Sequence, residues 1–276
     1  MGKETELGDL LTEQVDRAGA DFDRLSSIDA MDRLVAHQAE AVAVVARIGT
    51  VLAHASDAAA ERLQAGSGRI IYGGAGTSIR LGVQDGVELT PTFGWPFERL
   101  GFCIAGGFDA LLRAQEGAED DYAAGQAAVA ELAVTRDDVV LAIAASGRTP
   151  YTLGVAEAAR ARGAMTLGFA NVPDAPLFSM VDFAILLQTG PEVLSGSTRL
   201  AAGTAQKIAL NMWSTVAMTR LGRVWGNQMI CVQATNAKLR ARQLRILMDF
   251  SGCSKEQARM RLENSEWDLS KALGRD

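Results

Sequence analysis

Three short turns in the sequence combine glycine with serine or threonine, as the binding of a phosphate and several hydroxyl groups would require. They cover residues 74–78 (Gly-Ala-Gly-Thr-Ser), 146–150 (Ser-Gly-Arg-Thr-Pro) and 195–199 (Ser-Gly-Ser-Thr-Arg). The first two follow short apolar runs, and the third precedes a long helical pattern. Free backbone N–H groups and the helix dipole favour an anion where a strand turns into a helix. Three such turns on one face of a domain would form a pocket for a sugar phosphate.

No single turn is specific, because a hydroxyl beside glycine is often a plain helix cap. The first turn is not a Walker motif, since no Gly-Lys-Ser/Thr follows it. It is not a dinucleotide fingerprint either, because the G-x-G-x-x-G spacing fails at Ile79. The functional interpretation therefore depends on whether the turns meet at one edge of a sheet.

The elements that must position these turns follow from the hydrophobic pattern. Short apolar runs without polar alternation predict strands that are buried on both faces. The runs cover residues 69–72, 139–145, 165–169 and 183–187, with 100–104 as a weaker fifth candidate. Helical patterns separate or follow them, at 126–132, 151–162 and 201–221. This alternation is typical of a parallel sheet with helices on both faces, which binds ligands beyond the carboxyl ends of its strands.

Helical segments flank this α/β region on both sides. Apolar residues spaced three and four apart predict a helical stretch that starts after Ser26 and Ser27 and runs, with one break, to residue 63. Past residue 236 we expect helices at 238–250, 257–263 and 268–273, the second beginning with a Ser254–Gln257 capping box. We therefore divide the chain into an N-terminal helical arm (1–46), an α/β sandwich domain (47–228) and a C-terminal three-helix domain (229–276).

Composition excludes several classes of function. The 276 residues are 48% hydrophobic and 22% charged, with a formal net charge of -6. An acidic balance argues against nucleic acid, and no apolar run reaches the roughly 18 residues of a membrane span. The charged N-terminus is unlike a secretory signal. Three scattered cysteines and two histidines, His37 and His54, argue against disulfides, metal sites and a Ser-His-Asp triad. We expect a cytoplasmic globular protein.

Taken together, the turns and their surroundings resemble the N-acetylmuramic acid 6-phosphate etherases, over nearly the whole chain. This family is built on the sugar isomerase (SIS) domain, a flavodoxin-like three-layer α/β sandwich. The stretches that carry the resemblance are 74–78, 144–151, 190–194, 196–200, 203–207 and 232–239. The C-terminal helices resemble the family's small terminal domain, although they end early here.

The resemblance implies a carbon–oxygen lyase without metal or organic cofactor that works as a homodimer. Family members cleave the lactyl ether of N-acetylmuramic acid 6-phosphate to N-acetylglucosamine 6-phosphate and D-lactate. A carboxylate removes the C2 proton of the opened sugar, a second carboxyl protonates the departing ether oxygen, and water then adds. Two carboxyl groups in different environments suit this chemistry.

The family's motifs map onto named residues of this chain. Glu88 matches the catalytic acid and Glu119 matches the second catalytic glutamate. Without the resemblance, Glu88 would be interpreted as part of a mixed loop or helix end, and Glu119 as part of a solvated acidic run. The substrate-binding candidates are Gly76, Thr77, Ser78, Ser146, Gly147, Thr149, Glu192, Ser195, Ser197 and Thr198.

Three departures from the family pattern fall near the expected pocket. Ile79 replaces a glycine and is expected to narrow or reroute the phosphate turn. Phe108 replaces a glutamate, and Ala201 stands where a lysine is usual. Loss of that cation would weaken anion binding, unless the lysine is only a surface residue. Because both glutamates remain, the pattern favours preserved elimination chemistry on a changed substrate, a related sugar ether.

Two other functions fit parts of the sequence. SIS domains also serve as non-catalytic phosphosugar sensors, and the family resembles a vertebrate kinase regulator, but a pure binder need not keep two glutamates. An SIS isomerase that interconverts aldose and ketose phosphates would also move a C2 proton with a carboxylate. Product analysis separates the three functions: an etherase releases a hydroxy acid, an isomerase makes a ketose, and a sensor makes no product.

Overall fold

A parallel five-stranded sheet forms the centre of the computed structural model, which describes residues 21–113, 115–234 and 236–274. The strand order is β2-β1-β3-β4-β5. The strands are β1 (Ile70–Gly74), β2 (Leu100–Ile104), β3 (Val139–Ile143), β4 (Met165–Ala170) and β5 (Phe183–Leu186). β1, β3 and β4 are buried along their whole length, which explains their unbroken apolar sequences. The predicted α/β class is confirmed.

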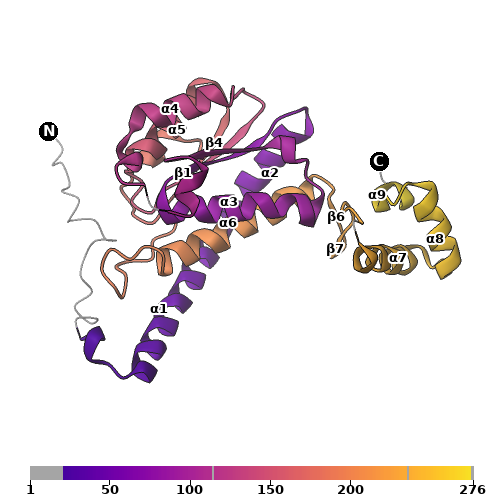
Figure 1. Ribbon diagram of the computed structural model, residues 1–276, viewed down its shortest axis with the longest axis horizontal. Coiled ribbons are helices and arrows are strands. Elements are labelled where there is room, and N and C mark those ends of the chain that lie inside the picture. Colours follow the sequence, from indigo (N-terminus) through magenta and orange to yellow (C-terminus); the bar gives the residue numbers. More distant parts are fainter. Residues whose placement is uncertain (1–20, 114, 235, 275–276) are drawn as a thin grey trace.

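Helices cover both faces of the sheet (Figure 1). α2 (Gly49–Gln64), α3 (Gly76–Phe93) and α6 (Ala201–Arg220) share one hydrophobic cluster with the sheet. α4 (Tyr122–Glu131) and α5 (Pro150–Ala161) share a second cluster with the opposite face. The result is the predicted three-layer sandwich.

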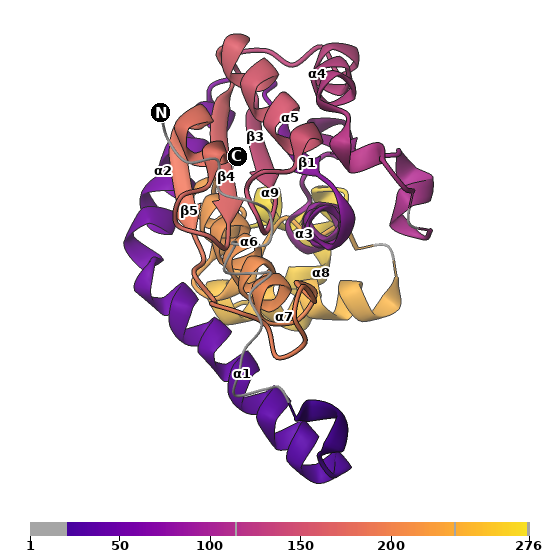
Figure 2. The ribbon, with the colours of Figure 1, turned by 90° about the vertical axis from the view of Figure 1, so that its left-hand side faces the viewer.

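The predicted N-terminal helical stretch is two helices. α1 (Ser27–Arg47) begins at the Ser26 cap, and the chain bends by 59° before α2. The second half of α1 buries Ala41, Val44 and Val45 against the body of the protein, while its first half extends away from it (Figures 1 and 2). Among the described residues no single helix is long and apolar enough to cross a membrane, and α1 with α2 passes that test only as a bent pair.

The C-terminal helices have a hydrophobic cluster of their own. A hairpin of β6 (Val224–Trp225) and β7 (Gln228–Met229), absent from the sequence prediction, leads into them. α7 (Ala237–Ser251), α8 (Lys255–Asn264) and α9 (Leu269–Ala272) follow close to the predicted bounds. The predicted capping box of Ser254 and Gln257 is confirmed.

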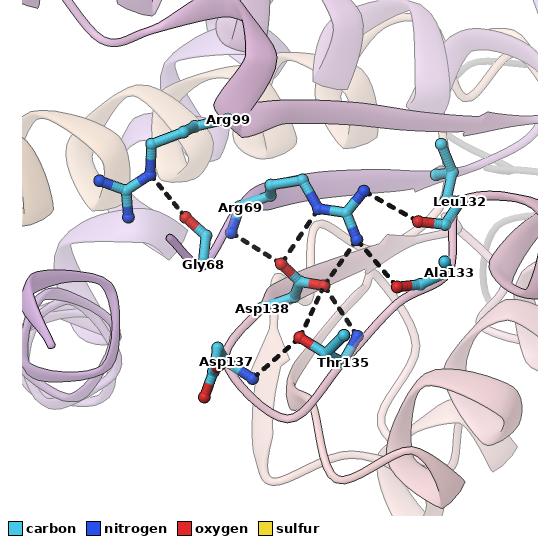
Figure 3. Close-up of polar contacts among 8 residues, drawn as sticks. All are labelled: Gly68, Arg69, Arg99, Leu132, Ala133, Thr135, Asp137 and Asp138. Atoms are coloured by element: carbon cyan, nitrogen blue, oxygen red, sulfur yellow. Dashed lines mark hydrogen bonds and ion pairs between the residues drawn. The ribbon is translucent and has the colours of Figure 1, made fainter. Parts of the chain in front are cut away.

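An ion pair between the partly exposed Arg69 and the buried Asp138 connects the start of β1 to the loop before β3 (Figure 3). One Asp138 oxygen accepts the Arg69 backbone N–H at 2.7 Å, and the other accepts Arg69 Nη2 and the Thr135 N–H, both at 2.8 Å. Arg69 also donates to the carbonyls of Leu132 and Ala133. Burial by itself raises the pKa of Asp138, but the hydrogen bonds from Arg69 and Thr135 outweigh it and hold the pKa below its ordinary value.

Replacing Asp138 by alanine is expected to lower the free energy of unfolding by about 3 kcal/mol, because Arg69 and two backbone N–H groups lose their acceptor. Since folding lowers this pKa, the contribution is fully present above the unfolded pKa of about 4 and is lost as the pH falls through the folded pKa. In urea unfolding, the free energy of unfolding of the variant should therefore fall well below that of wild type at neutral pH, and the difference should be smaller in acid. An equal difference at both would contradict a charge-dependent role.

Candidate active site

The first two Ser/Thr turns meet at the carboxyl ends of β1 and β3, around a cavity of about 260 Å³. The start of α6 closes the same cavity through Thr198. The lining residues are Ala75, Gly76, Thr77, Ser78, Glu119, Ala144, Ala145, Ser146, Thr149 and Thr198. Seven of the twelve predicted site residues thus lie around one pocket. The three alanines in this lining were not predicted as site residues, because their side chains have no polar or reactive group. Their small size leaves room in the pocket.

Two helices begin at this pocket without a side-chain cap. Neither Ala75 before α3 nor Thr149 before α5 caps its helix with a side chain. By contrast, side chains cap α1, α4, α7, α8 and α9. Uncapped N–H groups and two helix dipoles therefore point at one cavity, an arrangement that binds phosphate. A larger cavity of about 580 Å³ at the C-terminal helices lacks this feature, because Asp268 caps the helix that begins beside it.

Glycine is required in the second turn. Gly147 adopts φ of 59°, in the left-handed region that costs other residues energy. A Cβ there would lie 2.4 Å from the Cβ of Ala175. The chain can therefore pass close to its neighbour while Ser146 and Thr149 face the cavity.

Glu119 is the only charged residue among those that line this pocket. It lies in the short 3-10 turn Ala118–Asp120, on the long connection between β2 and α4. Arg80 of α3 holds this connection, donating from Nε to the Leu111 carbonyl at 3.0 Å and from Nη2 to the Ala110 carbonyl at 2.9 Å. This role of Arg80 was not predicted from the sequence. A carboxylate at an otherwise hydroxyl-lined anion pocket is suited to a sugar hydroxyl or a proton transfer rather than to the phosphate itself.

Glu88 is not brought to this pocket within one chain. It lies on the exposed side of α3, not in a loop or at a helix end. Gly76, which begins α3, lines the pocket, and Glu88 lies more than three turns further along, about 18 Å at 1.5 Å per residue. Within one chain, therefore, Glu119 lines the pocket and Glu88 does not.

The three departures from the family pattern lie outside the pocket lining, contrary to expectation. The side chain of Ile79 is buried in the hydrophobic core on the first turn of α3, so it does not narrow the anion site. Phe108 is exposed and packs edge-on against Phe102. Ala201 is buried, and its N–H donates to the Glu192 carboxylate. None of these three residues therefore gives a structural reason to expect a changed substrate.

The remaining predicted binding residues do not line the pocket either. Gly147 shapes the turn, and Glu192 is fully buried at the start of α6. Ser195 and Ser197 lie in the connection before α6, where Ser197 donates its N–H to the Leu194 carbonyl at 2.9 Å. Their roles toward a ligand remain predictions.

Known proteins resemble this chain both in family models and in fold. The family model described as SIS domain matches residues 121–218, and that of the glucokinase regulatory protein N-terminal SIS domain matches residues 43–160. A phosphoheptose isomerase from Francisella tularensis has the same fold, with a TM-score of 0.52 and 19% identity over 72% of this chain and all of that one.

Curated relatives are much closer in sequence. N-acetylmuramic acid 6-phosphate etherase from Deinococcus radiodurans is 50% identical over 262 residues, which cover 95% of this chain and 86% of the relative. The enzyme of that name from Nostoc punctiforme is 49% identical, over 94% of this chain and 84% of the relative. Identity of this degree over almost the whole length shows that the chain belongs to the N-acetylmuramic acid 6-phosphate etherase family.

Proposed function

We propose that this protein is a carbon–oxygen lyase that removes D-lactate from N-acetylmuramic acid 6-phosphate and adds water to give N-acetylglucosamine 6-phosphate. The observation that carries the proposal is the pocket where two uncapped helices, Ser78, Ser146 and Glu119 come together. It offers donors for a phosphate and a carboxylate beside them, in a chain about half identical to the named etherases.

The chemistry follows from the sugar. Opening the ring exposes the C1 aldehyde, which makes the C2 proton acidic. A carboxylate takes that proton, the C3–O bond to the lactyl group breaks, and a carboxyl group returns a proton to the leaving oxygen. Water then adds at C3 of the unsaturated aldehyde, and C2 regains a proton. Each positioned acid or base contributes about 10²–10⁴-fold to the rate.

Glu119 and Glu88 have different parts in this scheme. In this proposal the phosphate and the neighbouring carbons of the open-chain sugar occupy the cavity of about 260 Å³, and C2 and C3 lie at its mouth. Glu119, which lines the cavity, then contacts the sugar oxygens next to the phosphate-bearing carbon and assists ring opening. Glu88 handles the protons at C2 and at the C3 oxygen.

Glu88 has to come from a second copy of the chain, since its own pocket is about 18 Å away along α3. Its exposure on α3 and the exposed apolar side chain of Val87 beside it suit burial against another subunit. We therefore propose a homodimer in which Glu88 of the partner subunit completes each site.

The decisive experiment is incubation with N-acetylmuramic acid 6-phosphate in H₂¹⁸O, followed by mass spectrometry. Release of D-lactate with ¹⁸O in the sugar product is expected. Lactate that carries the label would instead indicate attack on the lactyl carbon and would contradict elimination. A ketose product would indicate an isomerase.

One observation favours a non-catalytic phosphosugar sensor: the match to the glucokinase regulatory protein model over residues 43–160. A folded protein that binds the sugar phosphate and releases no lactate in the same assay would support that function.

Replacing both Ser78 and Ser146 by alanine is expected to raise KM by about 10²-fold, because two hydroxyl donors to a charged phosphate are lost. The value of kcat should change little, since neither hydroxyl reaches C2 or C3. Replacing Ser179 by alanine provides the matched control, because this exposed serine lies in the Pro176–Met180 turn and does not line the pocket. An unchanged KM in the double variant would place the phosphate elsewhere.

A further inference from the structure

The carboxylate of Glu192 is fully buried and caps the N-terminus of α6. Each of its oxygens accepts one backbone N–H of the first turn, from Ala201 at 3.0 Å and from Ala202 at 2.9 Å. No side chain of the N-cap residue, Leu200, competes for these groups. Glu192 therefore occupies the position that an anion takes at the start of a helix, so α6 has no free N-terminus to offer a ligand.

Histidine 37 of α1 lies over this carboxylate. His37 Nε2 lies 2.9 Å from the Pro191 carbonyl, and Nδ1 lies 3.7 Å from a Glu192 oxygen. That Nδ1 atom is buried and has no hydrogen-bond partner. Among the described residues no lysine or arginine forms an ion pair with Glu192. The backbone N–H groups of α6 therefore hydrogen-bond this buried carboxylate, and the His37 ring lies beside it.

The hydrogen bonds from Ala201 and Ala202 to Glu192 hold together the two ends of the 193–200 loop, which contributes Thr198 to the lining of the pocket. The chain leaves Glu192, passes through Ser195 and Thr198, and returns to the carboxylate at Ala201. Thr198 lines the pocket, and its carbonyl accepts the Gly203 N–H at 2.8 Å. Glu192 itself does not reach the cavity.

We infer that Glu192 is a positioning residue that holds the 193–200 loop closed, so that Thr198 completes the phosphate pocket, with His37 bracing it from α1. This role rests on the proposed function only for the identity of the ligand. The loop contacts exist without one, so they can be tested separately.

In Glu192→Gln the amide NH₂ faces a backbone N–H donor, and one N–H at the start of α6 loses its acceptor. Hydrogen exchange of the substrate-free protein should then accelerate at least tenfold in residues 193–202, as expected for the loss of a charge-assisted hydrogen bond. Asp182→Asn is the matched control: Asp182 also accepts a backbone N–H and a hydroxyl, both from Thr166, but before β5, at the other end of the sheet. It should leave exchange at 193–202 unchanged.

With N-acetylmuramic acid 6-phosphate, Glu192→Gln should raise KM about tenfold and change kcat by less than about threefold, since the loop affects binding and not the reacting carbons. A fall in kcat at constant KM would overturn the inference. A raised KM without faster exchange would do so as well, because it would indicate direct contact with the substrate.

If wild type cleaves no ether, the proposed function fails while the exchange result still decides the role of Glu192. Should Glu192→Gln not fold, His37→Gln tests the same contact more gently. It should accelerate exchange in the same residues by a smaller factor, and unchanged exchange there would also overturn the inference.

Discussion

Replacing Glu88 by glutamine is expected to lower kcat by about 10²–10⁴-fold and to leave KM almost unchanged. Glutamine keeps the shape of the side chain but can neither take the C2 proton nor return one to the ether oxygen. Binding should persist, because the phosphate pocket does not include Glu88. The rate of D-lactate release at several substrate concentrations separates the two constants.

Two further variants control this result. Glu98→Gln removes another exposed carboxylate, near the start of β2, and should keep wild-type activity. Glu119→Gln should lower kcat and raise KM together, because Glu119 lines the pocket as well as serving the chemistry. Among the described residues Glu88 has no hydrogen-bond or ion-pair partner within its own chain, so its variant should melt at the wild-type temperature. Wild-type kcat in Glu88→Gln would remove this residue from the mechanism.

The strands and most helices could be predicted from the sequence because burial dictates their pattern. β1, β3 and β4 have neighbours on both faces, so nearly every position is apolar or glycine. The C-terminal helices carry local signals, such as the Ser254 capping box, that need no tertiary information. The pocket was also predictable, because the carboxyl ends of parallel strands meet at one edge.

Helix α3, which carries Glu88, was not predicted, and the reason is tertiary. Gly82, Gly86 and Pro91 each lower helix propensity, by about 1 kcal/mol for a glycine and about 3 for a proline. A Cβ at Gly86 would lie 2.8 Å from the Tyr72 ring, and one at Gly82 would lie 2.9 Å from the side chain of Ile143. The glycines let α3 lie close against the sheet, which single-sequence propensity cannot reveal.

The sequence also did not predict correctly where some individual side chains point. Ile79 and Glu192 both lie in stretches that suggest ligand binding, yet Ile79 points into the core and Glu192 caps α6. Both assignments depend on where a helix begins. Because α3 starts at Gly76, its fourth residue, Ile79, faces the sheet. Predicting this orientation requires the first residue of the helix to be known within one position.

Coexpression of Glu88→Gln and Glu119→Gln chains is expected to restore about a quarter of wild-type activity, although either variant alone is nearly inactive. If each site takes Glu119 from one chain and Glu88 from the partner subunit, a mixed dimer has one site with both glutamates and one with neither. Random pairing makes about half of the dimers mixed, and each of those has one working site of two. Differently tagged chains, purified through both tags, should give about half of wild-type activity per dimer.

The same experiment tests whether one chain can supply both groups. A site built within one chain would keep one defect in every copy, so the mixture would be no more active than the two variants measured separately. Coexpressing Glu88→Gln with an identical Glu88→Gln chain under the second tag controls for dimer stabilisation by the tags and should remain inactive. Because Glu88 lies about 18 Å along α3 from Gly76 at the pocket, the proposed dimer predicts that activity recovers.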